Sequence, residues 1–415
     1  MKNPFGAREG SGAAVRYEVR KDYRRFDQKR NMIYQGEWNP AFAGLSRADL
    51  RRAREDKLKR NLPGFTRLDW AYQMAATANS DASRFVINVP DSGGTSWRGI
   101  AKAAIGSEAV DGLPEYRGEP ASNARAIKKM AALFGAHDVG ICLLDRRWVY
   151  SHHYDPATRE SYPIHFSDEA GYEKYTEPGM LEDRSQVIPA GMKYVVVFIH
   201  EMDYRGIAAA PTLTQMATTL RTYSEISLTT ISMAEFIRGL GYHAIPSANC
   251  TAINIPLAID AGLGELGRNA KLIHPRFGPR CRISKVITDL PLEADVPLAF
   301  GVTAFCDTCK KCARTCPGQA IPQGDRSFEP VGEFSSHGVR QWQVDHDRCK
   351  KYQAKVGTNC GICLKACPYN KPDGMGHWLV KSLIATAPGM NCLLLMGEDL
   401  LGYGTHRQGD RFWNP

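Results

Sequence analysis

Long apolar segments are missing from this sequence. The uncharged stretch at 382–397 is interrupted by a Pro–Gly pair, and it is shorter than the roughly 20 apolar residues that a transmembrane helix needs. The opening MKNPFGAREGSG lacks the apolar centre of a signal peptide, and the pair Arg24–Arg25 is followed by polar residues instead of an apolar run. Taken as given, the chain is therefore expected to be intracellular or to be a form without its leader.

Signatures of nucleotide cofactors are also missing. The glycines of AGLGELG at 261–267 follow a helical pattern, whereas the dinucleotide-binding turn follows a strand directly. Neither a flavin nor a nicotinamide site is indicated, and the sequence contains no internal repeat.

Positive charge is unevenly distributed. The net charge is +9, and residues 1–60, with sixteen Lys/Arg and eight Asp/Glu, contribute +8 of it. A basic region attracts nucleic acid, anionic lipid or an acidic partner, but more often it is the solvated face of a helix. The second interpretation is favoured here for RRAREDKLKR at 51–60.

Cysteine is abundant, and eight of the twelve cysteines lie in two blocks, CDTCKKCARTCP and CKKYQAKVGTNCGICLKACP. The first block has the spacing C-x2-C-x2-C-x3-C-P of bacterial 4Fe–4S ferredoxins, and the second keeps its C-x2-C-x3-C-P ending. Because the last cysteine of such a run ligates the other cluster, two ligand sets are predicted: Cys306, Cys309, Cys312 with Cys367, and Cys349, Cys360, Cys363 with Cys316. A zinc site or a disulfide framework is the alternative, but eight thiols exceed the four ligands of a zinc ion.

Helices that alternate with buried strands predict a mixed α/β (α+β) fold. Helices are expected at about 46–61, 121–135 and 211–238, and buried strands at 138–145 and 193–200. The predicted units are an N-terminal unit (1–115), a core (116–140 and 193–300), an insertion with loops (141–192), a cluster module (301–372) and an aromatic wrapping tail (373–415).

The order PLAIDAGLGELGRN, TDLPL and a double ferredoxin run resembles the corrinoid-dependent iron–sulfur reductases, a group of epoxyqueuosine reductases and reductive dehalogenases. The N-terminal 115 residues, the aromatic tail and CPYNKPDG resemble the reductive dehalogenases in particular, and the compact length resembles mature forms that act on small chlorinated alkanes or alkenes. The resemblance covers about 116–372 and implies a nitroreductase-like core that binds a cobalamin-type corrinoid, followed by a ferredoxin-like domain with two 4Fe–4S clusters. D-x-H-x-x-G, which places a histidine on cobalt in other cobalamin proteins, is absent, so no protein histidine is expected on the cobalt.

The resemblance also implies a catalytic triplet. In the family a tyrosine on the helix after the second core strand is the acid, an asparagine follows about 26 residues later and an arginine 33 beyond that; here these are Tyr223, Asn249 and Arg282. A phenol is a weak acid, and a guanidinium beside it stabilises the phenolate, so such a pair can act as a general acid. The alternative is a core tyrosine, an ion-paired arginine and a turn asparagine.

Further site residues are predicted with less support from the pattern. Corrinoid contacts are expected from Thr219, one helical turn before Tyr223, and from Gly262, Gly264, Gly267, Arg268 and Asn269. An apolar substrate slot is expected from Trp97, Tyr352, Trp378 and Tyr403, which are otherwise ordinary core aromatics.

The predicted reaction is R–Cl + 2e⁻ + H⁺ → R–H + Cl⁻ on substrates such as chloroform, trichloroethane or chloroethenes, with a Co(I) corrinoid fed by the clusters. One alternative is epoxyqueuosine reduction on tRNA, whose enzymes use a carboxylate as acid; another is an electron carrier without cobalt. By resemblance the partners are a halogenated substrate, an electron donor, a small membrane anchor protein and a second copy of the chain, with no nucleic acid. The same resemblance implies a peripheral position on the periplasmic side of the cytoplasmic membrane.

Overall fold

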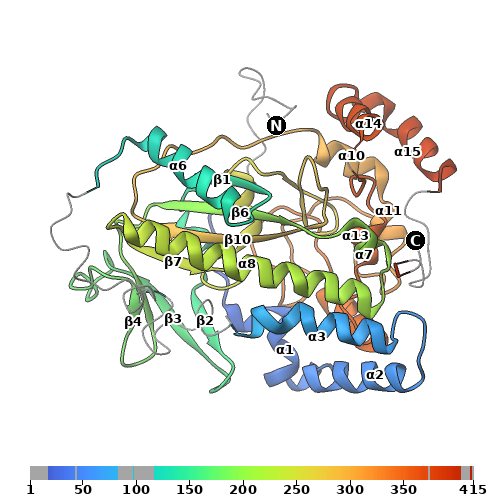
Figure 1. The fold of residues 1–415 in the computed structure, drawn as a ribbon, viewed down its shortest axis with the longest axis horizontal. Helices are drawn as coiled ribbons and strands as arrows, with labels where there is room; N and C mark the ends of the chain where they lie inside the picture. The colour runs from blue at the N-terminus through green and yellow to red at the C-terminus, as the bar shows by residue number, and fades with distance from the viewer. Residues whose placement is uncertain are drawn as a thin grey trace.

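Four strands from distant parts of the chain form an antiparallel sheet at the centre of the protein (Figure 1). The computed structural model describes residues 17–42, 44–82, 97, 116–372, 374–402 and 412–413. The strand order is β1-β6-β10-β7, with β1 at Asp138–Leu143, β6 at Tyr194–Glu201, β10 at Cys281–Thr288 and β7 at Ala244–Ser247.

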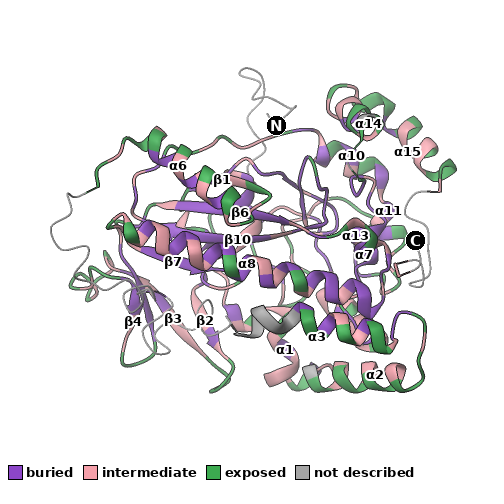
Figure 2. Cartoon of the chain, viewed as in Figure 1, coloured by how far each residue is buried: buried purple, intermediate pink, exposed green. Residues whose placement is uncertain are grey.

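The sheet is covered on both faces, as the unbroken apolar run of β6 requires. Successive side chains of a strand point to opposite faces, and Val195 and Val197 accordingly enter one core while Val196 and Phe198 enter the other. The first core includes α9 (Asn254–Asp260), and the second includes α6 (Pro120–Leu133) and α8 (Leu213–Gly239). Figure 2 shows the central strands as largely buried.

The predicted core elements are present in the structure. The helix expected at 46–61 is α2 (Arg47–Lys59), which begins at a capping box of Ser46 and Asp49. The helix expected at 211–238 is α8, which begins where the Thr212 side chain accepts a hydrogen bond from the backbone of Gln215. Both starts agree with the sequence because capping depends on neighbouring residues only.

The insertion differs from the expectation of loops. Its residues form a second sheet of order β2-β3-β5-β4, with β2 at His152–Asp155, β3 at Glu160–Phe166, β4 at Gly179–Met180 and β5 at Gln186–Ile188. These strands are short and mix buried with half-buried positions, so they leave no clear alternation in the sequence.

The N-terminal segment contacts both the core and the C-terminal half. α3 (Arg67–Ala82) lies along α8 (Figure 1), and the side chain of Lys57 on α2 donates to the carbonyl of Val356 at 2.7 Å. Near the C-terminus, Trp413 donates to Asp69 at 3.0 Å, and Phe412 stacks on Tyr72. The described end of the tail therefore lies against α3.

Short helices dominate the cluster module and the segment after it: α10 (Val302–Cys309), α11 (Lys311–Arg314), α12 (His346–Val356), α13 (Ile362–Lys365), α14 (Met375–Thr386) and α15 (Asn391–Leu400). Among the described residues no single helix is long and apolar enough to cross a membrane; two segments, Gly376–Thr386 and Pro388–Leu400, reach that length only together and are bent by 116°. Their outer side exposes apolar side chains, among them Trp378, Leu393, Met396 and Leu400.

The remaining elements are η1 (Gln28–Arg30), α1 (Met32–Trp38), η2 (Pro40–Phe42), η4 (Arg146–Trp148), α7 (Tyr204–Ala208), β8 (Glu265–Leu266), β9 (Leu272–Ile273) and η5 (Pro388–Met390).

Candidate functional site

The predicted triplet comes together at one end of the central sheet. The hydroxyl oxygen of Tyr223, on α8, accepts a hydrogen bond from Asn249 Nδ2 at 2.8 Å. The guanidinium carbon of Arg282, on β10, lies 5.5 Å from the centre of the Tyr223 ring. Tyr223 and Arg282 are half-buried and Asn249 is exposed. The phenol therefore has an amide donor at its oxygen and a cation over its ring.

The backbone explains why these three residues meet. α8 crosses the sheet, Arg282 is the second residue of β10, and Asn249 lies in the loop between β7 and α9. β7 pairs with β10 along the outer edge of the sheet, so the loop that follows β7 passes close to the helix above that edge. The roles of the triplet remain proposals, since geometry alone does not test them.

Thr219 is fully packed within the protein. It is 1% exposed, and its hydroxyl oxygen accepts a hydrogen bond from Gln215 Nε2 at 3.1 Å. A Cβ atom built on Gly361, the residue after Cys360, would lie 2.7 Å from the Gln215 side chain. The first half of α8 thus touches the cluster module directly at Gln215, about two turns before Tyr223.

The first predicted cysteine set surrounds one hollow. Cys306 and Cys309 lie on α10, Cys312 on α11 and Cys367 after α13, and all four line a hollow with Gly267, Arg268, Asn269 and Tyr369. Burial raises the pKa of Cys312 and of Cys367 well above the usual thiol value, and the charge of the nearby Cys306 raises both further. Thiolates in such surroundings need cations, which fits an iron–sulfur cluster.

The second set is gathered in the same way. Burial raises the pKa of Cys360 to about 12, and Cys363, Cys349 and Cys316 contribute through their proximity. Cys316 of the first block therefore lies among cysteines of the second, just as Cys367 lies near Cys306 and Cys309. This arrangement fits the crossed ligand sets expected from the spacing.

The zinc and disulfide alternatives find no support in this geometry. None of the twelve cysteines, all of which lie in the described part of the chain, forms a disulfide bond. Across residues 116–372 and the rest of the described chain, no three His, Cys, Asp or Glu side chains are close enough to hold a single metal ion. The thiols of the first set line a hollow, which suits a four-iron cube.

The glycine-rich segment packs on the chain itself. At Gly262 a Cβ atom would lie 2.5 Å from the carbonyl oxygen of Val296, and at Gly264 it would lie 2.4 Å from that of Ile273. Their φ angles of +72° and +156° also disfavour a side chain. The need for glycine at these two positions is explained by the chain's own backbone, and contact with a corrinoid there remains a prediction.

Arg268 and Asn269 join this segment to the cluster module. Arg268 is 1% exposed; its Nε donates to the carbonyl of Cys306 at 3.0 Å and its Nη1 to that of Pro322 at 2.8 Å. Asn269 Nδ2 donates to the carbonyl of Cys363 at 3.5 Å. Both residues contact the backbone of cluster cysteines, a role that the sequence pattern did not indicate.

We expect Gly264→Val to lower iron and cobalt content together. The valine would displace β9 and with it Arg268 and Asn269, which hold the cysteine loops. Gly239→Ala, at the end of α8 with open space around its Cα, is the matched control. Metal analysis of both purified variants checks this, and a loss of cobalt with normal iron would instead support direct contact with the corrinoid.

The predicted aromatic slot is not assembled as one unit. Trp97 is 3% exposed and belongs to the core that contains Val149 and Tyr150. Tyr352 lies on α12 beside Gly318, near Cys360 and Cys316, whereas Trp378 is 48% exposed on α14. Tyr403 lies outside the described residues. The described members of the set therefore lie in different parts of the fold, and their role in substrate binding stays a prediction.

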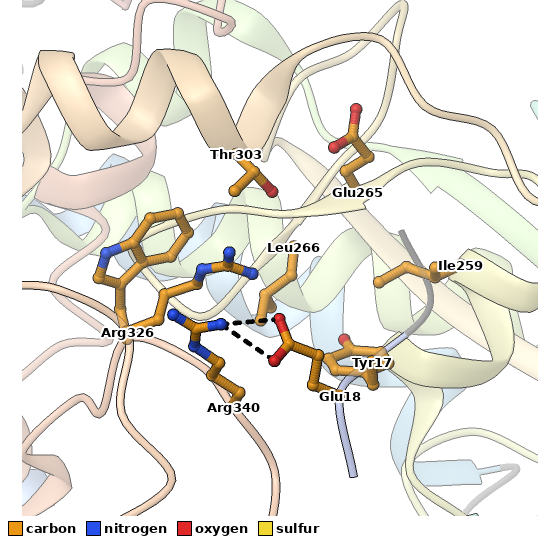
Figure 3. A pocket seen from close by; sticks show the side chains of 9 residues that line it. Tyr17, Glu18, Ile259, Glu265, Leu266, Thr303, Arg326 and Arg340 are labelled. Atoms are coloured by element: carbon orange, nitrogen blue, oxygen red, sulfur yellow. Dashed lines mark hydrogen bonds and ion pairs between the residues drawn. The ribbon is translucent and has the colours of Figure 1, made fainter. Parts of the chain in front are cut away.

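A separate hollow, partly open to solvent, is lined by none of the triplet residues (Figure 3). Its lining residues are Tyr17, Glu18, Ile259, Glu265, Leu266, Thr303, Arg326, Arg340 and Trp342. Arg340 pairs with Glu18 at 3.0 Å across it. Burial raises the pKa of Glu265, although its carboxylate accepts from the backbone of Phe300 at 2.5 Å. Glu265 therefore anchors the start of α10 and belongs to the structural frame of the cluster module.

Two protein-family models match the chain. Residues 44–292 match a reductive dehalogenase subunit, and residues 305–370 match a 4Fe-4S double cluster binding domain. The tetrachloroethene reductive dehalogenase of Sulfurospirillum multivorans is 35% identical over 316 residues, which cover 74% of this chain and 62% of that protein. The enzyme of the same name from Desulfitobacterium hafniense is 37% identical over 270 residues, 61% of this chain and 49% of that protein. The match thus spans about half to three-fifths of these longer relatives.

Solved structures give the same fold. A catabolic reductive dehalogenase superposes with a TM-score of 0.67 at 22% identity, covering 95% of this chain and 48% of the other. Another reductive dehalogenase, studied for B12-dependent dehalogenation, gives 0.67 at 23% identity with the same coverage. The mixed helix-and-sheet fold with a double cluster domain is thereby confirmed. An epoxyqueuosine reductase from Lactococcus garvieae is 29% identical over only 124 residues, 29% of this chain.

Proposed function

Because the chain belongs to the reductive dehalogenase family, we propose that it removes chloride reductively from small chlorinated aliphatic hydrocarbons, with a proton from Tyr223. The relatives with the names given above act on tetrachloroethene, which makes chlorinated ethenes the favoured substrates over chloroalkanes. The observation that carries the proposal is the hydrogen bond from Asn249 to Tyr223 beside the Arg282 guanidinium.

A corrinoid fits the polar groups around this triplet. Arg282 Nε and Gln215 Oε1 are buried and have no hydrogen-bond partner within the described structure. Arg282 lies over the Tyr223 ring, and Gln215 lies about two turns before Tyr223 on α8. The amide-rich rim of a corrinoid offers donors and acceptors for both. Thr219, Gln215 and Arg282 are therefore the proposed contacts. When bound, the corrinoid supplies a cobalt centre that passes electrons to the carbon–halogen bond.

The protein's own groups supply the proton and control its direction. The Tyr223 hydroxyl gives its proton to the carbon that loses chloride, and the phenolate that remains is stabilised by the amide of Asn249 and the cation of Arg282. No carboxylate is within hydrogen-bond distance of the Tyr223 oxygen among the described residues, which favours this reading over epoxyqueuosine reduction.

The two cysteine sets lie in a defined order relative to this site. The second set touches α8 and its surroundings, because Gly361 adjoins Gln215 and Leu364 packs with Met202. The first set packs with Ile384 of α14 and with α15. We propose that electrons enter at the first set and reach the site through the second.

The membrane partner remains a proposal as well. The outer side of α14 and α15 exposes apolar side chains, and such a surface suits an apolar partner. We propose that a small membrane anchor protein binds there and holds the enzyme on the periplasmic side of the membrane. A homodimer is compatible with this arrangement.

Metal content is the simplest test of the proposed function. We expect about eight iron and one cobalt per chain in protein produced with corrinoid, and chloride release from tetrachloroethene and trichloroethene with an artificial reductant. Chloroform and trichloroethane in the same assay separate alkane from ethene preference. Iron without cobalt would indicate an electron carrier, and a tRNA mobility shift without chloride release would favour epoxyqueuosine reduction.

A further inference from the structure

We propose that Asn254 and Lys285 are positioning residues that fix the direction of hydrogen bonding at Tyr223, so that its oxygen accepts from Asn249 and its proton remains available for the substrate. The inference rests on the proposed role of Tyr223 as the acid. Neither residue belongs to the triplet, and Lys285 lies on the opposite face of β10 from Arg282, since three positions separate them.

The side-chain amide of Asn254 has only one possible orientation. Its Nδ2 lies 2.8 Å from the carbonyl oxygen of Ala248 and 3.1 Å from that of Ile283, and both oxygens can only accept. Its Oδ1 lies 2.6 Å from Lys285 Nζ, an ammonium that can only donate. Reversing the amide would place oxygen against two carbonyls and NH₂ against a cation.

The fixed amide of Asn254 in turn orients Asn249. Asn254 Nδ2 also lies 3.2 Å from Asn249 Oδ1, so that its two hydrogens are shared among three acceptor oxygens. Facing this NH₂, Asn249 keeps its oxygen toward Asn254 and its own NH₂ toward Tyr223, 2.8 Å away. The Tyr223 oxygen is therefore an acceptor in this bond, and its single proton is not used there. After proton transfer the same N–H stabilises the phenolate, whereas a reversed amide would repel it.

Lys285 is fully buried and keeps the side-chain amide of Asn254 in this orientation. It also donates to the carbonyl oxygens of Ala248 and Cys250, at 3.2 and 3.1 Å. Among the described residues, the nearby thiol of Cys250 is the titratable group that opposes the effect of burial on the pKa of Lys285, and no carboxylate pairs with the ammonium. Burial lowers the pKa of Lys285 to about 8, so the ammonium persists at neutral pH and is lost as the pH rises above that value.

Asn249→Asp tests the direction of the bond with almost no change in shape. The carboxylate would accept from Asn254 and present its second oxygen to Tyr223, which would then have to donate its proton. We expect turnover to fall by about tenfold or more, because a donor to the developing charge is lost. We also expect Tyr223 to ionise at higher pH, measured as the ultraviolet tyrosinate titration of each protein minus its Tyr223→Phe counterpart.

Asn254→Leu and Lys285→Met test the two positioning residues. Each is expected to lower kcat several-fold with little change in KM, and to have no further effect in the Asn249→Ala background, since both act through Asn249. The wild type is expected to lose part of its activity above about pH 8, where Lys285 loses its proton. Lys285→Met should not show this part of the loss. Equal losses in the wild-type and Asn249→Ala backgrounds would show a merely structural role and overturn the proposal.

The titration separates this inference from the proposed function. A wild type that releases no chloride, combined with a shifted Tyr223 titration in Asn249→Asp, would reject the function and keep the orientation of the bond. A wild type that dechlorinates, combined with unchanged titration and turnover in Asn249→Asp and Asn254→Leu, would reject the orientation and keep the function.

Discussion

Tyr223→Phe is expected to lower dechlorination by at least about a hundredfold while both clusters and the corrinoid remain bound. General acids contribute about 10²- to 10⁴-fold to a rate, and the change removes only the hydroxyl group. The aromatic ring keeps its packing with Ile226 and Ala248, so the fold should survive. Reduction of cobalt should also survive, because neither cysteine set depends on the phenol. The measurement is the chloride release rate with an artificial reductant, normalised to cobalt and iron content.

Two comparisons make this result specific. Tyr242→Phe removes a hydroxyl that donates to the carbonyl of Tyr116 far from the triplet, and it should leave the rate unchanged. At Arg282, lysine keeps the charge but loses the planar fork, so Arg282→Lys should retain more activity than Arg282→Ala. A fully loaded Tyr223→Phe protein with near-normal turnover would eliminate Tyr223 as the acid.

The double-cluster domain and the main core elements were accessible from the sequence because their signals are local. Cysteine spacing reflects the geometry of a cluster, the apolar run of β6 reflects burial on both faces, and the capping box at Ser46 lies within four residues. The insertion sheet was not accessible in this way. The strands of this sheet are short, and β3 pairs in parallel with β5, which comes after β4 in the sequence. The stability of the sheet therefore depends on contacts between distant residues.

The candidate site shows the same limit. The triplet could be proposed by resemblance, but the contact between Asn249 and Tyr223 depends on how the loop after β7 passes α8. Lys285 was missed, although a lysine within the apolar run of CRISKVIT was a usable signal, since a buried cation needs fixed partners. For the glycine-rich segment, the sequence predicted corrinoid contact, which stays a prediction, and it did not reveal that carbonyls of the same chain approach Gly262 and Gly264.

Cys367→Ala is expected to destroy the cluster held by Cys306, Cys309 and Cys312, even though Cys367 belongs to the other block of the sequence. In the structure Cys367 is buried, lies after α13 and has Cys306 and Cys309 as close electrostatic neighbours. The set of Cys349 retains all four of its thiols, because its proposed fourth ligand is Cys316, which lies near Cys360. Iron content should therefore fall by about half.

The loss of this cluster should abolish turnover with a physiological donor, since the first set is the proposed entry point for electrons. EPR of the reduced protein identifies which cluster remains, and Cys316→Ala should give the reciprocal result. Cys392→Ala changes an exposed cysteine on α15 and should leave both signals intact. If Cys367→Ala instead removed the signal of the Cys349 set and spared the other, the fourth ligand would belong to its own block. The crossed arrangement, and with it the proposed order of electron transfer through the module, would then have to be abandoned.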